Sequence, residues 1–483
     1  MFFQSKNGGS CTMKDENQRL DLKNIQSVHM IGIGGIGMSA LAHILLDQGI
    51  RISGSDREES DTTRRLKDRG AIIYTGHEAS HVKEVDWLVY SAAIPKDNPE
   101  RQEALLKKIP EMDRAELLGK IMKLYPQSVA VAGSHGKTTT TAMLSCLLEW
   151  AGLDPTVLVG GYLNEIGGNV KVGKGPHLVT EACEYHGSFL RFPPRIGIVL
   201  NIDLDHLDYF ENLAAIQAVF GDFVEQLPPE GLLVMNGDDA NSAHLARVAD
   251  CPVIRFGLCQ DCDLKASNLE VDDSGRYSFT VRFQERNLGR FTLGIPGKHH
   301  VHNALASLAV ALELGVSGEK LKEILSDFHG LHRRFESLGN WHDVTVVDDY
   351  AHHPAEILAT LQTARSAVSP RGKVYCIFQP HTYTRTLALL NEFADALALA
   401  DGVVVTDIFA AREPDRGLVH SRDLVKEILT RGGKAIYAAT PDEAAGEAAS
   451  LAAAGDMILT MGAGPVNELA PMLENQLGIK NDE

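Results

Sequence analysis

The sequence has little of several features that mark whole classes of protein. No uninterrupted apolar run approaches the roughly 18 residues of a membrane-spanning helix, so we expect no transmembrane segment. Basic residues are also few, with 46 Lys and Arg against 64 Asp and Glu and a net charge of −18. Because nucleic acids and anionic membranes bind basic surfaces, we expect neither as the main partner.

The first residues do not have the pattern of a targeting segment. After Met1–Phe3 they are polar, and they lack the apolar core of a signal peptide. We therefore expect residues 1–22 to be a disordered lead-in and the protein to be cytoplasmic.

Cysteine is scarce as well. The 7 cysteines are scattered and odd in number, which favours reduced thiols over a disulfide framework. Cys259 and Cys262 have the C-x-x-C spacing of half a zinc site, and Cys251 is nearby. No second C-x-x-C and no histidine pair follows at zinc-finger spacing, so we interpret these residues as surface thiols.

The most informative segment is residues 129–140, VAVAGSHGKTTT, in which a short apolar strand runs into a glycine loop. Backbone N–H groups at such a loop and at the following helix N-terminus attract anionic oxygens. Lys137 can reach the outer phosphates of a nucleotide, and the Thr138 hydroxyl can bind Mg²⁺. Val131 replaces the early glycine of the usual motif, so a plain glycine turn is the alternative. The predicted nucleotide-binding residues are Gly133, Ser134, His135, Gly136, Lys137, Thr138 and Thr139.

A second glycine motif, GIGGIG at residues 32–37, follows an earlier apolar strand and precedes a predicted helix over residues 38–48. A further strand ends at Asp56, at the distance where an acidic residue accepts hydrogen bonds from a ribose. Gly32 and Gly34 permit the tight turn, and Gly37 permits close helix packing. A domain without ligand and an NAD-dependent enzyme are the alternatives.

The length of 483 residues predicts two to four domains. We divide the chain into residues 1–123, 124–329 and 330–483. Strands alternate with helices in all three, which predicts an α/β protein with a Rossmann-like parallel sheet first and last. The central domain is predicted to be a P-loop ATPase domain, with antiparallel strands added between residues 265 and 295.

Polar residues follow several predicted strands, where ligands collect in open α/β sheets. Glu181 ends one strand and His206 follows another, and together with Thr138 they are candidates for a divalent metal site. The nearby Asp203, Asp205 and Asp208 leave the choice of ligand open, and a structural histidine is the alternative.

Further candidates lie around the start of the third domain. The cluster at 296–303 opens a helix and can contact a base or a phosphate, and Arg333 and Arg334 can reach a γ-phosphate. An arginine pair that only holds Glu336 is the alternative. After later strands come residues 348–354, DDYAHHP, and Arg385, which suits a substrate carboxylate.

Taken together, these motifs resemble the Mur ligase family, the ATP-dependent amide-forming enzymes of peptidoglycan precursor synthesis. The resemblance covers the chain from about residue 24 to residue 464 and is closest to the branch that adds the first amino acid. The segments that carry it are residues 32–40, 53–56, 91–94, 98–100, 333–336, 348–354 and 378–381.

The resemblance implies an enzyme that ligates L-alanine to the carboxylate of UDP-N-acetylmuramate, through an acyl phosphate, with release of ADP and phosphate. It implies ATP and Mg²⁺ as cofactors, these two small molecules as partners, and a monomer or homodimer. It also implies a role in cell-wall biogenesis, cell shape and cell division. Two alternatives remain open: a murein peptide ligase with a peptide acceptor, and a non-catalytic nucleotide-binding regulator.

The resemblance also implies site roles. It assigns UDP rather than NAD to the first domain, adenine to His299 and Asn303, the ATP ribose to Asp349, and the γ-phosphate to Arg334. It places Tyr350, His352 and Arg385 around alanine. The implied UDP-sugar residues are Gly32, Gly34, Gly35, Ile36, Gly37, Asp56, His77 and Ser91. The implied metal ligands are Thr138, Glu181 and His206, and the implied catalytic residues are Lys137, Glu181, His206, Arg334, His352 and His353, the last two as candidate bases.

Three positions depart from the family pattern. His300 stands where the family usually has asparagine, and Thr382 stands where many members have arginine. No lysine lies between residues 175 and 264, so a carbamylated lysine is not expected to bridge a second metal.

Overall fold

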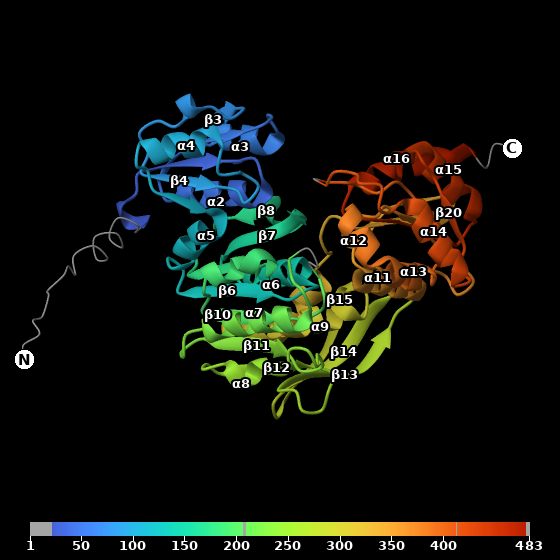
Figure 1. Ribbon diagram of the computed structural model, residues 1–483. Helices are drawn as coiled ribbons and strands as arrows, with labels where there is room; N and C mark the ends of the chain where they lie inside the picture. The colour runs from blue at the N-terminus through green and yellow to red at the C-terminus, as the bar shows by residue number, and fades with distance from the viewer. Residues whose placement is uncertain (1–21, 206–208, 412, 480–483) are drawn as a thin grey trace, which may run out of the picture.

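The computed structural model describes residues 22–205, 209–411 and 413–479, which form three β-sheets with helices on both sides (Figure 1). The expectation of a disordered lead-in falls, except for Leu22, outside these residues, and so do His206 and Asp208. Among the described helices, none is long and apolar enough to cross a membrane.

The first sheet is wholly parallel, as the sequence predicts, with the strand order β3-β2-β1-β4-β5. Every residue of β1 is buried, because helices cover both faces of a parallel sheet. The strands are β1 (Ser27–Ile31), β2 (Arg51–Asp56), β3 (Ile72–Thr75), β4 (Trp87–Tyr90) and β5 (Glu111–Asp113). The helices are η1 (Leu22–Asn24), α2 (Ile36–Asp47), α3 (Asp61–Asp68), η2 (Ala79–His81), α4 (Pro99–Leu106) and α5 (Arg114–Met122).

The middle sheet has the order β15-β14-β13-β12-β11-β10-β6-β9-β7-β8. Strands β7, β9, β6, β10, β11, β12 and β13 run parallel, and β8, β14 and β15 pair antiparallel with their neighbours. The antiparallel strands predicted between residues 265 and 295 are thereby confirmed.

The middle strands are β6 (Gln127–Ala132), β7 (Thr156–Leu163), β8 (Gly168–Lys171), β9 (His177–Ala182), β10 (Ile196–Val199), β11 (Leu232–Asn236), β12 (Val253–Gly257), β13 (Leu264–Val271), β14 (Arg276–Phe283) and β15 (Arg286–Pro296). The helices are α6 (Lys137–Trp150), η3 (Asn164–Ile166), η4 (Tyr185–Arg191), α7 (Leu213–Glu225), α8 (Leu245–Val248), α9 (His299–Glu313) and α10 (Gly318–Ser326).

Helices α6 and α9 pack against each other in the middle core. Met143, Leu144 and Leu147 of α6 and Leu305 of α9 are buried in the same apolar cluster. Helix α9 begins at His299, within the cluster at 296–303 that was expected to open a helix. His299 and Asn303 therefore lie one helical turn apart on one face of α9.

The third sheet has the order β16-β17-β21-β18-β19-β20. It is parallel as predicted except at β16, which pairs antiparallel with β17. The exception has a local cause: His342 and Asp343 alone join the two strands, both with positive φ (53° and 62°), and a two-residue turn of this kind connects only antiparallel neighbours.

The third-domain strands are β16 (Glu336–Trp341), β17 (Val344–Asp349), β18 (Val374–Phe378), β19 (Gly402–Val405), β20 (Ala435–Tyr437) and β21 (Met457–Met461). The helices are α11 (Pro354–Ala367), α12 (Tyr383–Ala388), α13 (Leu390–Leu397), α14 (Ser421–Thr430), α15 (Pro441–Leu451), η5 (Pro465–Leu469) and α16 (Ala470–Ile479).

The six described cysteines are free. The interpretation of the C-x-x-C pair as surface thiols is wrong for Cys262, which is buried with 6% of its surface exposed, whereas Cys259 is half-buried. Cys262 is buried because its turn folds back on the end of β11: a Cβ atom placed on Gly237 would lie 2.6 Å from the Cys262 Sγ atom.

Candidate active site

The loop between β6 and α6 has the geometry of an anion cradle. Gly133 and Gly136 have φ values of 143° and 85°, which side chains rarely adopt. A Cβ atom on Gly136 would lie 2.8 Å from the Asn303 Oδ1 atom, so only glycine fits between the loop and α9. Asn201 holds the loop in place, because its Oδ1 atom accepts the His135 N–H at 2.8 Å.

Lys137, the first residue of α6, points back into this loop. Its ammonium group donates to the carbonyl oxygens of Gly133 and Ser134 and to the carboxylate of Glu184, at 3.0 Å for the closest Glu184 oxygen. Burial lowers the pKa of Lys137, but the negative charge of Glu184 outweighs this effect and raises the pKa above its ordinary value. The loop therefore contains a fixed cation.

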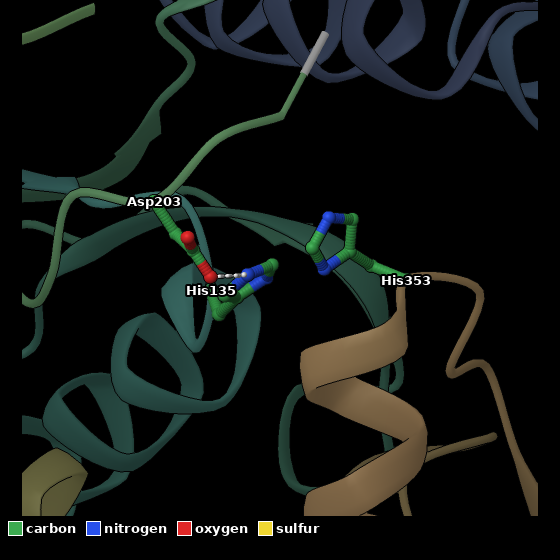
Figure 2. Close-up of side chains that lie close together, drawn as sticks. All are labelled: His135, Asp203 and His353. Atoms are coloured by element: carbon green, nitrogen blue, oxygen red, sulfur yellow. Dashed lines mark ion pairs between the residues drawn. The ribbon is translucent and has the colours of Figure 1, made fainter. Parts of the chain in front are cut away.

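His135 of the same loop lies between two domains. Its ring is 3.4 Å from a carboxylate oxygen of Asp203 and 3.6 Å from one of Glu356 on α11, and it lies beside the ring of His353 (Figure 2). Burial alone would lower the pKa of His135, but the two carboxylates outweigh burial and raise the pKa to about 9. The ring is therefore protonated at neutral pH, yet both of its buried nitrogens lack a well-aligned hydrogen bond to any described residue.

The predicted metal ligands Thr138 and Glu181 lie on either side of two glycines in β7. A Cβ atom on Gly160 would lie 2.8 Å from the Glu181 Oε1 atom, and one on Gly161 would lie 3.3 Å from the Thr138 Cγ2 atom. The Gly160 N–H donates to Glu181 at 2.5 Å, which orients the carboxylate. Hydroxyl and carboxylate oxygens are ligands that Mg²⁺ accepts, so these two residues fit the ion; His206 is outside the described residues.

We call residues 133–136, between β6 and α6, the phosphate loop. A cavity of about 270 Å³ lies between this loop, α9 and the third domain. Burial lowers the pKa of His299 to about 4, so its ring is neutral, and burial raises the pKa of Asp349 to about 6. His300 also lines the cavity, with its Nδ1 atom 3.0 Å from the Asn303 amide nitrogen. The predicted nucleotide residues in its lining are His135, Gly136, Thr139, His299, Asn303, Arg334 and Asp349.

This lining suits a nucleotide. The protonated ring of His135, whose buried N–H groups require an acceptor, lines the cavity, and the same loop holds the fixed ammonium of Lys137. The far wall of the cavity presents neutral imidazole and amide groups from α9. Anionic phosphates at one end and a base at the other would satisfy both sets of groups.

The two neighbouring arginines of the third domain are not equivalent. The Arg333 Nε atom donates to the buried Asp348 at 3.0 Å, and the same guanidinium donates to the Gly462 carbonyl at 2.7 Å. Arg334 has no such ion pair among the described residues, and it lines the cavity. Both guanidinium groups lie about 5 Å from the Tyr350 ring, at 5.1 and 5.2 Å.

The residues predicted around alanine lie at the same junction of domains. His352 has its Nδ1 atom 3.0 Å from the Tyr350 carbonyl and 3.3 Å from Glu356, and burial lowers its pKa. The guanidinium of Arg385 lies 3.4 Å from Asp205 of the middle domain.

His353 crosses the same junction, because its Nε2 atom lies 3.2 Å from the Leu204 carbonyl oxygen. The histidine also caps α11. Burial lowers the pKa of His353 as well. Two neutral imidazoles, His352 and His353, therefore lie at this junction, and His353 is beside the His135 ring of the loop.

The predicted UDP-sugar residues form a separate group at the first sheet. The Asp56 Oδ2 atom accepts the Gly34 N–H at 2.7 Å, so the carboxylate holds the glycine loop. A Cβ atom on Gly32 would lie 3.3 Å from the Ser91 Cβ atom, which places Ser91 against the same loop. His77 contacts the Ser55 hydroxyl at 3.0 Å. Gly35 caps α2, which starts at Ile36, an exposed residue, and includes Gly37.

Sequence reasoning missed two carboxylates of the site. Glu184 follows β9 in the segment 181–184, EACE, and Glu356 follows the histidine pair by three residues. Burial raises the pKa of Glu356, but His352, His135 and Arg334 together hold it well below its ordinary value. An acidic residue near the start of α11 is the only local signal for Glu356, and the same position often serves only to cap a helix.

Three family descriptions match successive parts of the chain. "Mur ligase family, catalytic domain" matches residues 27–126, "Mur ligase middle domain" matches 131–311, and "Mur ligase, glutamate ligase domain" matches 333–464.

Two similar proteins and one solved structure extend these matches to nearly the whole chain. UDP-N-acetylmuramate–L-alanine ligase from Alkaliphilus metalliredigens is 48% identical, over 94% of this chain and 98% of its own. The enzyme of the same name from Caldanaerobacter subterraneus subsp. tengcongensis is 49% identical, over 93% and 97%. The crystal structure of UDP-N-acetylmuramate–alanine ligase MurC from Thermotoga maritima superimposes with a TM-score of 0.77 at 29% identity, over 95% of this chain and 100% of that one. The chain therefore belongs to the Mur ligase family.

Proposed function

We propose that this chain is an ATP-dependent ligase that joins L-alanine to the carboxylate of UDP-N-acetylmuramate, releasing ADP and phosphate, in peptidoglycan precursor synthesis. The observation that carries the proposal is the cavity in which the phosphate loop, the neutral His299 and Arg334 meet. The relatives that are 48% and 49% identical carry the name of this activity, which supports the choice of substrates.

The chemical difficulty is that a carboxylate and a nucleotide triphosphate repel each other. Lys137 and Arg334 supply two cations that offset this repulsion, and His135 adds a third charge beside them. ATP would supply the phosphoryl group that activates the carboxylate. Thr138, Glu181 and His206 are the proposed ligands of Mg²⁺, which would further reduce the repulsion. The proposed sites for UDP and for the ATP ribose are the Asp56 loop and Asp349.

The second step requires a free amine. Alanine enters as an ammonium ion, so a neutral base has to take a proton from it. His352 and His353 are neutral because burial lowers their pKa values, and both lie at the junction where the third domain meets the loop. Arg385 is the proposed partner of the alanine carboxylate. Contact between the domains also excludes water, which protects an activated carboxylate from hydrolysis.

The activity test is phosphate release from ATP and Mg²⁺ with UDP-N-acetylmuramate, across L-alanine, glycine, L-serine and the murein tripeptide. Release that requires both the sugar nucleotide and L-alanine is expected. Release only with the tripeptide would identify a murein peptide ligase instead, and no release with any pair would contradict the proposal.

We further propose that the protein is cytoplasmic and that it acts as a monomer or homodimer. Size-exclusion chromatography with light scattering tests the oligomeric state.

A further inference from the structure

One cluster of metal-ligating side chains lies outside the residues proposed for catalysis. Cys259 and Cys262 occupy the turn after β12, and Asp238 follows the end of β11. One carboxylate oxygen of Asp238 and both sulfur atoms lie within 4.8 Å of one another. A fourth group comes from α9: the His302 Nε2 atom lies 2.8 Å from the Asp238 Oδ2 atom.

The backbone is shaped around these side chains. The N–H groups of Leu258 and Cys259 donate to the Asp238 carboxylate at 2.6 and 2.9 Å, which fixes its orientation beside the thiols. A Cβ atom on Gly257 would lie 2.7 Å from the Asp238 Oδ2 atom, and one on Gly237 would lie 2.6 Å from the Cys262 Sγ atom. Two glycines therefore give the carboxylate and the buried thiol the space to approach each other.

We infer that Cys259, Cys262, Asp238 and His302 form a binding site for a thiophilic divalent cation of the Zn²⁺ type. Two sulfurs, an imidazole nitrogen and a carboxylate oxygen are a donor set that Zn²⁺ takes in tetrahedral sites. The C-x-x-C spacing supplies half of such a site, and the chain fold supplies the other half from residues distant in sequence.

The geometry requires two adjustments. The His302 Nε2 atom contacts Asp238 but does not belong to the set of donor atoms that all lie within 4.8 Å of one another, so its ring has to move toward the sulfur atoms. The two sulfur atoms are 2.7 Å apart, whereas two thiolates on a tetrahedral zinc ion are about 3.8 Å apart. Cys259 is half-buried on a turn, so rotation about its Cα–Cβ bond can separate the sulfurs. A disulfide would use the two cysteines alone, whereas a cation would also use the carboxylate and the imidazole.

The charges are consistent with a cation. A thiol has to lose its proton to become a zinc ligand, so binding of the cation releases protons and the affinity rises with pH. With two thiolates, one carboxylate and a neutral imidazole, a divalent cation brings the cluster from three negative charges to one.

The site would join three elements next to the cavity. Asn236 at the end of β11 and His302 on α9 both line the cavity, and the Asn236 side chain accepts the Asp238 N–H at 3.0 Å. A bound cation would tie the ends of β11 and β12 to α9. Its role is structural rather than catalytic, which separates it from the metal ion proposed at Thr138 and Glu181.

The test is a titration of the full-length, reduced and chelator-treated protein with Co²⁺ alone and then with Zn²⁺. We expect one Co²⁺ per chain with the visible bands of a tetrahedral site and a thiolate charge-transfer band, both abolished by Zn²⁺. The double variant C259S/C262S should lose the bands, and the matched control C251S should keep them. His302→Ala should weaken binding about ten-fold or more.

Several results would overturn the inference. They are the absence of stoichiometric Co²⁺ uptake by the reduced wild-type protein, bands without thiolate charge transfer, and equal uptake by C259S/C262S. A Cys259–Cys262 disulfide found by mass spectrometry, together with no uptake after reduction, would also overturn it. If the double variant fails to fold, the wild-type spectrum and the single variant C259S, at the less buried position, decide the question.

Discussion

The ammonium group of Lys137 lies 3.0 Å from the carboxylate of Glu184, whose side chain is 2% exposed. This pair joins the first turn of α6 to the end of β9. It keeps a cation at the phosphate loop before any nucleotide binds, because the buried carboxylate raises the pKa of the lysine. A phosphate bound at this loop, as proposed above, would therefore meet an ordered charge rather than a flexible side chain.

Replacing Glu184 by alanine tests this relationship. The variant leaves a buried ammonium without its carboxylate, so the apparent free energy of unfolding should fall by about 3 kcal/mol. The KM for ATP should rise, and Glu184→Gln, which keeps a hydrogen-bond acceptor, should lose less of both. The control is Glu149→Ala, which removes a partner of Lys171 in a more exposed pair and should change stability by less than about 1 kcal/mol. Equal losses in E184A and E149A, measured by urea denaturation, would contradict the prediction.

Arg333 and Arg334 form a natural pair of matched variants. Arg334→Ala should lower kcat by about 10²–10³-fold, because a cation aimed at developing charge is lost, with little change in stability. Arg333→Ala should chiefly lower stability, by about 2 kcal/mol, because Asp348 loses its partner in the interior. Steady-state kinetics and thermal denaturation of both variants separate the two roles. The prediction is wrong if R333A loses more kcat than R334A at full stability.

The pKa of His135 predicts a pH dependence of stability. Its folded value of about 9 lies above the ordinary 6.5, so the stabilisation is complete below pH 6.5 and disappears as the pH rises to 9. The difference between these two pKa values corresponds to about 3 kcal/mol of the free energy of unfolding. Between pH 6.5 and 9 the free energy of unfolding of the wild type should fall by this amount relative to that of His135→Asn. Urea denaturation at several pH values measures both. Parallel curves for the two proteins would show that His135 is not protonated at neutral pH.

Much of the fold follows from local sequence. The glycine loops at residues 32–35 and 133–136 lie between a strand and a helix as predicted, since apolar strands, turn glycines and helical periodicity are local signals. The antiparallel edge strand β16 was not predicted, because its cause is the conformation of only two residues, His342 and Asp343.

The site was predictable only in part. The residues that carry an obvious chemistry, such as Lys137, Arg334 and Asp349, are recognisable from their motifs. The charge partners of Lys137 and His135 are not recognisable in this way. Many carboxylates are available, and only the tertiary fold brings Glu184 to Lys137 and Glu356 to His135. The same reason explains the misinterpretation of Cys262, which is buried because the fold places its turn against Gly237 at the end of β11.

Arg385 gives a prediction about amino-acid binding. Its guanidinium is 3.4 Å from Asp205 across the junction between the middle and third domains. If the alanine carboxylate replaces Asp205 as its partner, Arg385→Ala should raise the KM for L-alanine about 30-fold or more, the effect of about 2 kcal/mol. The KM for ATP should change little. Arg365→Ala, which removes an exposed pair with Asp401, is the control and should leave both values unchanged.

Asp205→Asn distinguishes a competitor from a positioning residue. If Asp205 only occupies Arg385 until alanine arrives, its neutralisation should lower the KM for L-alanine, because the amino acid no longer has to displace a charged group. If Asp205 instead orients Arg385 for alanine, the same variant should raise the KM for L-alanine, as R385A does. We expect the first result, because the two groups meet at 3.4 Å, longer than a strong charged hydrogen bond, and an alanine carboxylate can bind a guanidinium through both oxygens. Initial-rate measurements over a range of L-alanine concentrations, at saturating ATP and UDP-N-acetylmuramate, give the answer.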